Sequence, residues 1–186
     1  MSQKRVVITG APGTGKTVVI KELESLGYFC YHEVIRDMTA AAKKMETQQE
    51  KVSNPLVFVD DPMEFNRQLL NGRKKHFEHS GQNDVPISFF DRGIPDVLAY
   101  MDYFDQKYLA YFEDYSRDYR YDHIFILPPW KSIYKTDNER LETFGEAKEL
   151  HHHLFDTYQR FGYEPIVVPK TTIEKRAAFI VETIGK

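Results

Sequence analysis

The segment GAPGTGKT, residues 10–17, has the composition and spacing of a loop that binds phosphate. It follows an apolar run and completes the pattern G-x-x-x-x-G-K-[ST]. Glycines allow backbone N–H groups to point toward phosphate oxygens, and the start of a following helix adds unpaired donors and a positive dipole. We therefore expect the phosphates of a nucleoside triphosphate to bind Gly10, Ala11, Pro12, Gly13, Thr14, Gly15, Lys16 and Thr17.

The last two residues of this loop predict specific chemistry. Lys16 is expected to contact the β and γ phosphates, and the Thr17 hydroxyl is expected to bind Mg²⁺. The alternative is a glycine turn with a purely structural role. Chance would produce the pattern in roughly one chain of this size in a hundred, and the flanking strand and helix signals reduce that figure further.

A carboxylate suited to the same metal ion occurs in the segment PISFFDRG. The largely apolar run ISFF precedes Asp91 and places it at the end of a predicted strand, where ligand sites of α/β proteins lie. We expect Asp91 to bind Mg²⁺ directly or through water, and Arg92 to bridge a transferred phosphoryl group or an acceptor oxygen. The alternatives are a helix cap for Asp91 and a structural ion pair for Arg92. Asp96 either complements the dipole of the next helix or contacts substrate.

These residues require a framework of alternating strands and helices. Several short apolar runs are nearly continuous, which is typical of parallel strands that helices cover on both faces. We therefore predict an α/β fold with three layers around a five-stranded parallel sheet. The predicted strands are residues 5–9, 28–32, 86–91, 123–127 and 165–169.

Capping signals and helical spacing locate the helices. One helix should follow Gly15 and end near Gly27, and another should begin after an Asp61 cap. Thr136 and Glu139 have the spacing of a capping box ahead of a third helix. The aromatic residues between positions 100 and 119 predict one further helix with a core-packing role.

We expect a single domain over residues 1–186 with two additions to the basic fold. A helical insertion over about residues 34–85 exceeds what one crossover needs, and it is suited to covering a substrate. A lid is expected over about residues 129–140. Within the insertion, the segment GRKKH at 72–76 predicts a solvated helix face, with contact to an anionic substrate as the alternative.

Composition limits the classes of function. A net charge of −3 gives no general basic field, so binding to nucleic acid or to an anionic membrane is not expected as the main activity. No run approaches about 18 apolar residues, and one cysteine, Cys30, cannot form an internal disulfide. These features predict a soluble cytoplasmic protein, and they leave its oligomeric state open.

Several segments together resemble a known family. They are residues 10–17, Glu33 with Arg36, and the segments FFDRGIPDVLAY, PPW, TDNERLE and GYEPIVVP. The chain resembles the small P-loop AAA-type ATPase and kinase-like family, whose relatives include nicotinamide riboside kinase-like and deoxynucleoside kinase-like domains. The resemblance covers nearly the whole chain and implies a P-loop NTPase fold of the nucleoside and nucleotide kinase type.

The resemblance also implies roles for acidic residues. In the related deoxynucleoside kinases an acidic residue after the second strand lies near the acceptor hydroxyl, and Glu33 matches it by order and context. Glu33 would accept or orient the hydroxyl proton, unless it only caps a helix or pairs with Arg36. This chain has Asp91 where those kinases typically have Glu, so their sugar recognition does not transfer.

Kinases of this fold commonly close a basic lid after the fourth strand. Lys131, Lys135 and Arg140 are the cations available here, and Arg140 is the candidate that neutralises charge on the transferred phosphoryl group. The alternative is a solvated helix face. Trp130 is expected to pack in the interior, with contact to adenine as the alternative.

These observations predict an ATP-binding, Mg²⁺-dependent phosphotransferase. The γ-phosphoryl group would move to a small hydroxyl or phosphate acceptor, for which a nucleoside-like molecule is one candidate. The alternative is an ATPase or a nucleotide-dependent switch that acts on a protein partner. GTP also remains open as the nucleotide, although the chain has no Asn-Lys-x-Asp segment.

Overall fold

Five parallel strands form one sheet in the computed structural model, which describes residues 3–35, 61–134 and 143–185. The strand order is β2-β3-β1-β4-β5. All five predicted strands are present, and each is parallel to its neighbours. Their bounds are β1 (Lys4–Gly10), β2 (Phe29–Tyr31), β3 (Ile87–Asp91), β4 (His123–Leu127) and β5 (Ile166–Val167).

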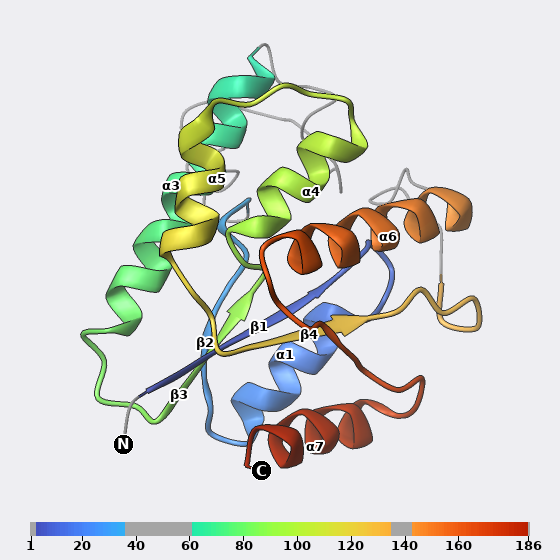
Figure 1. The fold of residues 1–186 in the computed structure, drawn as a ribbon. Helices are drawn as coiled ribbons and strands as arrows, with labels where there is room; N and C mark the ends of the chain where they lie inside the picture. Colours follow the sequence, from blue (N-terminus) through green and yellow to red (C-terminus); the bar gives the residue numbers. More distant parts are fainter. Residues whose placement is uncertain (1–2, 36–60, 135–142, 186) are drawn as a thin grey trace, which may run out of the picture.

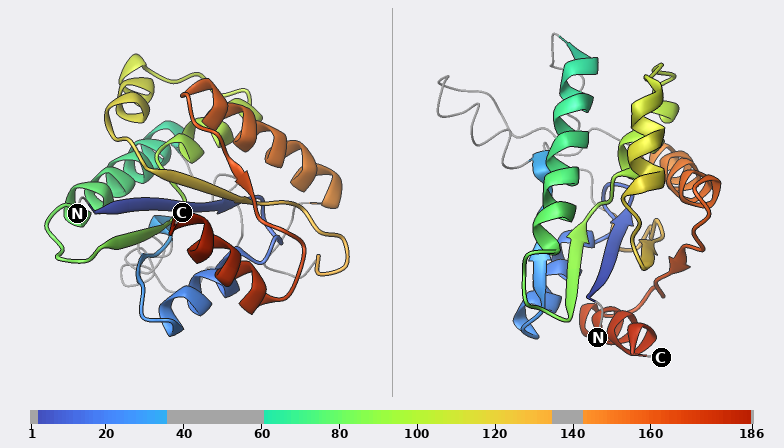
Figure 2. Two further views of the ribbon diagram at one scale, coloured as in Figure 1. Left: turned by 60° about the horizontal axis from the view of Figure 1, so that its bottom comes forward. Right: turned by 60° about the vertical axis from the view of Figure 1, so that its left-hand side comes forward.

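Helices cover both faces of this sheet, which confirms the predicted three-layer arrangement (Figures 1 and 2). Val6 and Ile8 of β1 pack against one pair of helices, whereas Val7 packs in a separate core on the opposite face. Helices α1 (Lys16–Ser25) and α7 (Ile173–Ile184) cover the first face. The second face is covered by α3 (Pro62–Ser80), α4 (Pro95–Tyr103), α5 (Ala110–Asp118) and α6 (Phe144–Arg160).

The predicted ends of the first two helices are confirmed. Helix α1 begins directly after Gly15, and Gly27 beyond its last turn has the left-handed φ of 88° that stops a helix. Asp61 caps α3, because its side chain accepts hydrogen bonds from the backbone N–H groups of Met63 at 3.1 Å and Glu64 at 3.0 Å.

The aromatic stretch forms two helices, so the prediction of one continuous helix is wrong. Helix α4 ends at Tyr103, and α5 begins at Ala110. Asp105 has a left-handed φ of 52°, and Gln106 N–H donates to the Met101 carbonyl at 2.8 Å. This is a helix-stopping motif in which a short polar residue takes the place that glycine usually occupies.

Helix α6 begins later than its expected cap. The Thr143 hydroxyl accepts a hydrogen bond from Glu146 N–H at 3.2 Å, and the Glu146 carboxylate accepts one from Thr143 N–H at 2.5 Å. The capping box is therefore the second Thr-x-x-Glu segment of this region. The predicted cap at Thr136 and Glu139 lies outside the described residues.

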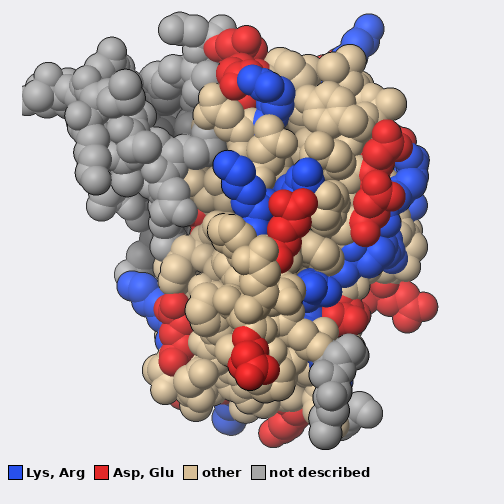
Figure 3. Space-filling view, turned by 90° about the vertical axis from the view of Figure 1, so that its left-hand side faces the viewer, with Lys and Arg blue, Asp and Glu red and all other residues tan. Residues whose placement is uncertain are grey.

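The described surface has mixed charge. On the face in Figure 3, Lys and Arg side chains are interspersed with Asp and Glu side chains. Among the helices that the structure describes, none combines the length and apolar character needed to span a bilayer.

Candidate active site

The phosphate-binding loop connects the end of β1 to the start of α1. Gly13 and Gly15 have left-handed φ values of 77° and 82°, which side chains rarely adopt. A Cβ atom on Gly13 would also lie 2.7 Å from the Tyr134 ring. Because α1 has no acidic residue in its first turn, its N-terminal N–H groups face the loop without a competing carboxylate from the same turn.

A basic residue from α7 supports the rim of this loop. Arg176 donates from Nη1 to the Thr14 carbonyl at 3.1 Å and from Nε to the Thr171 carbonyl at 2.9 Å. Its guanidinium carbon lies 5.1 Å from the centre of the Trp130 ring. Trp130 is half-buried in this contact, so it packs against the support of the phosphate loop.

Asp91 connects the loop to the end of β3. Its side chain is 1% exposed, and Oδ1 forms an ion pair with Lys16 Nζ. The second oxygen, Oδ2, is buried and has no hydrogen-bond partner in the described part of the chain. A buried carboxylate oxygen without a partner is costly, and a carboxylate oxygen is the ligand type that Mg²⁺ prefers. The buried carboxylate of Asp91 therefore fits a magnesium ion, for which Thr17 is the other expected ligand.

Arg92, the residue after β3, has an unusual backbone conformation. Its φ is 76°, a left-handed value that is uncommon for residues other than glycine. Its Nε forms an ion pair with Glu33 Oε2 at 2.6 Å, and Nη1 forms one with Asp96 Oδ1 at 3.1 Å. The guanidinium carbon lies 4.9 Å from the centre of the Tyr100 ring.

Glu33 follows β2 and lies between two arginines. Its Oε1 pairs with Arg73 Nη2 at 3.1 Å, in addition to the contact with Arg92. Burial alone would raise the pKa of Glu33, but the charges of Arg73, Arg92 and Lys16 outweigh burial and lower the pKa to about 2. The carboxylate is therefore ionised at neutral pH.

Arg73 corrects one expectation. It belongs to the segment 72–76, which was expected to be a solvated face, yet it is 4% exposed on the buried side of α3. It donates from Nη1 to the Gly93 carbonyl at 3.1 Å. The spacing of Phe65, Leu69, Arg73 and Phe77 is four residues throughout, and this spacing was the available signal that Arg73 lies on the apolar face.

Asp96 is a further buried acidic residue of the site, and it pairs with Arg92. It is fully buried and accepts hydrogen bonds from the Thr9 hydroxyl at 2.5 Å, the Tyr158 hydroxyl at 2.5 Å and Gly93 N–H at 2.9 Å. Neither the Thr9 nor the Tyr158 contact is evident from the sequence. Complementing a helix dipole is therefore only part of what Asp96 does.

The structure brings four of the predicted catalytic residues together, namely Lys16, Glu33, Asp91 and Arg92. They lie at the carboxyl ends of β1, β2 and β3. Arg140, the fifth predicted catalytic residue, lies outside the described residues, as do Arg36 and Lys135.

Comparison with known proteins gives one family match. A family profile described as an AAA domain matches residues 5–176. A nucleotide-binding protein of Aliivibrio salmonicida is 32% identical over 94 residues, a match that covers 47% of this chain and 30% of that protein. The match therefore spans less than a third of that relative's length.

Solved structures share the fold at low sequence identity. NadR in complex with NR aligns with a TM-score of 0.73 and 19% identity over 97% of this chain and 51% of its own. Deoxyadenosine kinase from M. mycoides, with dCMP and dCDP bound, aligns with a TM-score of 0.65 and 14% identity over 97% of this chain and 98% of its own. These similarities confirm the predicted three-layer P-loop fold.

Proposed function

This chain belongs to the AAA domain family, and from that premise we propose that it is a Mg²⁺-dependent phosphotransferase that uses ATP. The γ-phosphoryl group would pass to a hydroxyl or phosphate group of a small acceptor, with a nucleoside-like molecule as the first candidate. One observation carries the proposal: adjacent residues, Asp91 and Arg92, contact the phosphate-loop lysine on one side and a buried carboxylate on the other.

The phosphate loop would bind the triphosphate through backbone N–H groups and Lys16. Lys16 now pairs with Asp91, so nucleotide binding would exchange this carboxylate for phosphate oxygens. A magnesium ion held by Asp91 and Thr17 would neutralise charge on the phosphates. GTP is the alternative nucleotide.

Arg92 and Glu33 would bind the acceptor side of the transferred group. The Arg92 guanidinium is suited to an acceptor or phosphoryl oxygen, because it offers several donors in a fixed plane. Glu33 is a weak base with a pKa of about 2, so it would orient a hydroxyl by accepting its hydrogen bond. Catalysis would then depend on alignment and charge neutralisation.

The insertion and the lid have roles within the same proposal. Helix α3 belongs to the insertion over about residues 34–85, and its Arg73 contacts Glu33. This contact supports a role for the insertion in covering the acceptor. We propose that the lid over about residues 129–140 supplies Arg140 to the transferred phosphoryl group, within a single domain over residues 1–186.

The deciding experiment measures ADP release with ATP and Mg²⁺, with and without a panel of nucleosides, nucleotides and other small hydroxyl compounds. Acceptor-dependent release, with a product heavier by about 80 Da, is the expected result. The Lys16→Ala variant is the control for contaminating activity. Release that no acceptor alters would favour the ATPase or switch, and a parallel series with GTP tests the choice of nucleotide.

A further inference from the structure

Asp96 connects three parts of the site that come from distant positions in the chain. Its Oδ1 accepts from the Thr9 hydroxyl of β1 at 2.5 Å and from Arg92 Nη1 at 3.1 Å. Its Oδ2 accepts from Gly93 N–H at 2.9 Å and from the Tyr158 hydroxyl of α6 at 2.5 Å. A carboxylate has about four lone-pair sites, and these contacts use that capacity.

Two of these contacts act directly on Arg92. Gly93 N–H belongs to the peptide group that follows the left-handed Arg92 backbone, and Nη1 belongs to the Arg92 guanidinium. Asp96 therefore holds both ends of the residue, the backbone and the charged group. A left-handed arginine needs such support, because the conformation is unfavourable for a side chain with a Cβ atom.

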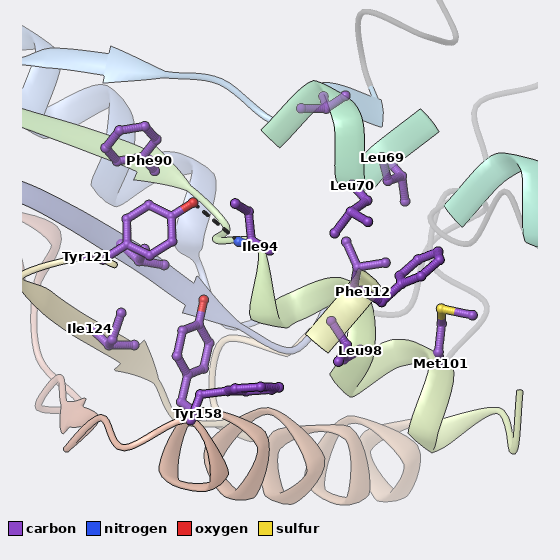
Figure 4. Packing of buried hydrophobic residues seen from close by; sticks show 14 of the residues in the cluster. Leu69, Leu70, Phe90, Ile94, Leu98, Met101, Phe112, Tyr121, Ile124 and Tyr158 are labelled. Atoms are coloured by element: carbon purple, nitrogen blue, oxygen red, sulfur yellow. Dashed lines mark hydrogen bonds between the residues drawn. The ribbon is translucent and has the colours of Figure 1, made fainter. Parts of the chain in front are cut away.

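The hydrogen bond from Tyr158 of α6 to Asp96 depends on the glycine at position 93. A Cβ atom on Gly93 would lie 2.5 Å from the Tyr158 hydroxyl oxygen, so glycine at this position lets the hydroxyl reach Asp96. Tyr158 extends from α6 toward the beginning of α4 (Figure 4). Its pKa is well above the ordinary value, since burial and the neighbouring Asp96 charge both favour the protonated form. The Tyr158 hydroxyl therefore stays protonated and donates its hydrogen bond to Asp96.

The remaining contact reaches the phosphate loop. Thr9 is the residue before Gly10, and its hydroxyl shares Asp96 Oδ1 with Arg92. We propose that Asp96, oriented by Tyr158, is a positioning residue that fixes Arg92 relative to the phosphate loop. The consequence for catalysis rests on the proposed function of Arg92, but the positioning itself does not.

Stability alone is a poor explanation for this arrangement. Asp96 is fully buried, and the free-energy cost of removing a carboxylate from water can exceed what its ion pair returns. Apolar residues of similar volume often replace buried ion pairs without loss of stability. The contact of Asp96 with Arg92 explains the buried carboxylate better, because an apolar side chain could not hold the guanidinium.

The test follows the guanidinium Nη protons of Arg92 by ¹⁵N NMR, with the signal assigned from Arg92→Lys, because Nη1 is the atom that pairs with Asp96. Asp96→Asn and Tyr158→Phe should each speed the exchange of these protons with water by about tenfold or more, because the hydrogen bond from Nη1 loses its charged acceptor in the first variant and an acceptor held in place by Tyr158 in the second. Tyr163→Phe is the matched control: its hydroxyl accepts from Tyr121 N–H at 3.2 Å and has no described contact with Asp96.

The proposal would be overturned if the Arg92 guanidinium protons exchanged at the same rate in a folded Tyr158→Phe variant as in the Tyr163→Phe control. This comparison needs only the Tyr158→Phe variant, so it decides the proposal even if Asp96→Asn does not fold. With an acceptor identified, kcat/KM for the acceptor should fall by about tenfold or more in Asp96→Asn, while the Kd for ATP changes by less than about twofold. A wild-type protein without phosphotransferase activity would refute the proposed function, whereas the NMR result would still decide the positioning role.

Discussion

Glu33→Gln is the substitution for which the structure gives the clearest magnitude. The pKa of Glu33 falls from 4.5 to about 2 on folding, because two buried arginines pair with its carboxylate. At 1.36 kcal/mol per pH unit, this difference corresponds to about 3 kcal/mol of stability at pH 7. The value agrees with the roughly 3–5 kcal/mol lost when one partner of a buried ion pair is removed.

The pH dependence of this effect has a definite sign. A carboxyl group whose pKa is lower in the folded state stabilises the protein fully above the unfolded pKa, here 4.5. The contribution is lost as the pH falls from 4.5 toward about 2, because the folded protein must then bind the proton as well. The difference in stability between wild type and Glu33→Gln should therefore be constant between pH 6 and 8 and should shrink below about pH 4.5.

Urea unfolding of both proteins at pH 7, 5.5, 4 and 3.5 measures this difference. Glu24→Gln is the matched control, because Glu24 is 37% exposed and pairs with His32 at the surface. Its effect should stay below about 1 kcal/mol. A Glu33→Gln effect below about 1 kcal/mol at pH 7, or one that is the same at pH 7 and pH 3.5, would refute the assignment of Glu33 as an ionised partner of two arginines.

Three further substitutions test the phosphate and metal assignments. Lys16→Ala should raise the Kd for ATP at least about tenfold in calorimetry, because it removes the charged donor of the loop; unchanged affinity would contradict the role of Lys16. Asp91→Asn should raise the Mg²⁺ concentration for half-maximal nucleotide binding by about tenfold or more, while an equal loss of folding stability and metal dependence would favour a structural role for Asp91. Gly13→Ala combines a left-handed φ with a contact of 2.7 Å to Tyr134, so it should cost at least about 1–2 kcal/mol in urea unfolding and also weaken ATP binding. An unaltered unfolding curve for Gly13→Ala would show that the loop can relax around the added methyl group.

The parts of the site that the sequence predicts are those defined within one short segment. The phosphate loop is contiguous, and Asp91 lies at the end of an apolar strand, so local pattern and strand position locate both. The strands are recognisable for the same reason, since each is a short apolar run. The stop between α4 and α5 is less evident, because Asp105 there takes a left-handed conformation without being glycine.

The remaining parts depend on packing between distant elements. Arg73 reaches Glu33 from 40 positions away, and Tyr158 reaches Asp96 from 62 positions away. Helical spacing places Arg73 and Arg176 on apolar faces of their helices, but it does not identify the partner of a charged residue. Such a partner is fixed by the sheet order and by which helix covers which face, and neither is contained in a local pattern.

The environment of Glu33 limits what its carboxylate can do in either candidate reaction. A carboxylate with a pKa of about 2 takes protons poorly. Phosphoryl transfer makes little demand on a base, because its transition state is loose and alignment and charge neutralisation contribute most, whether the attacking oxygen belongs to an acceptor or to water. Two arginines beside Glu33 lower its basicity and also fix its position. Glu33 is therefore suited to orienting an attacking oxygen, and the dependence of ADP release on an acceptor is what separates a kinase from an ATPase.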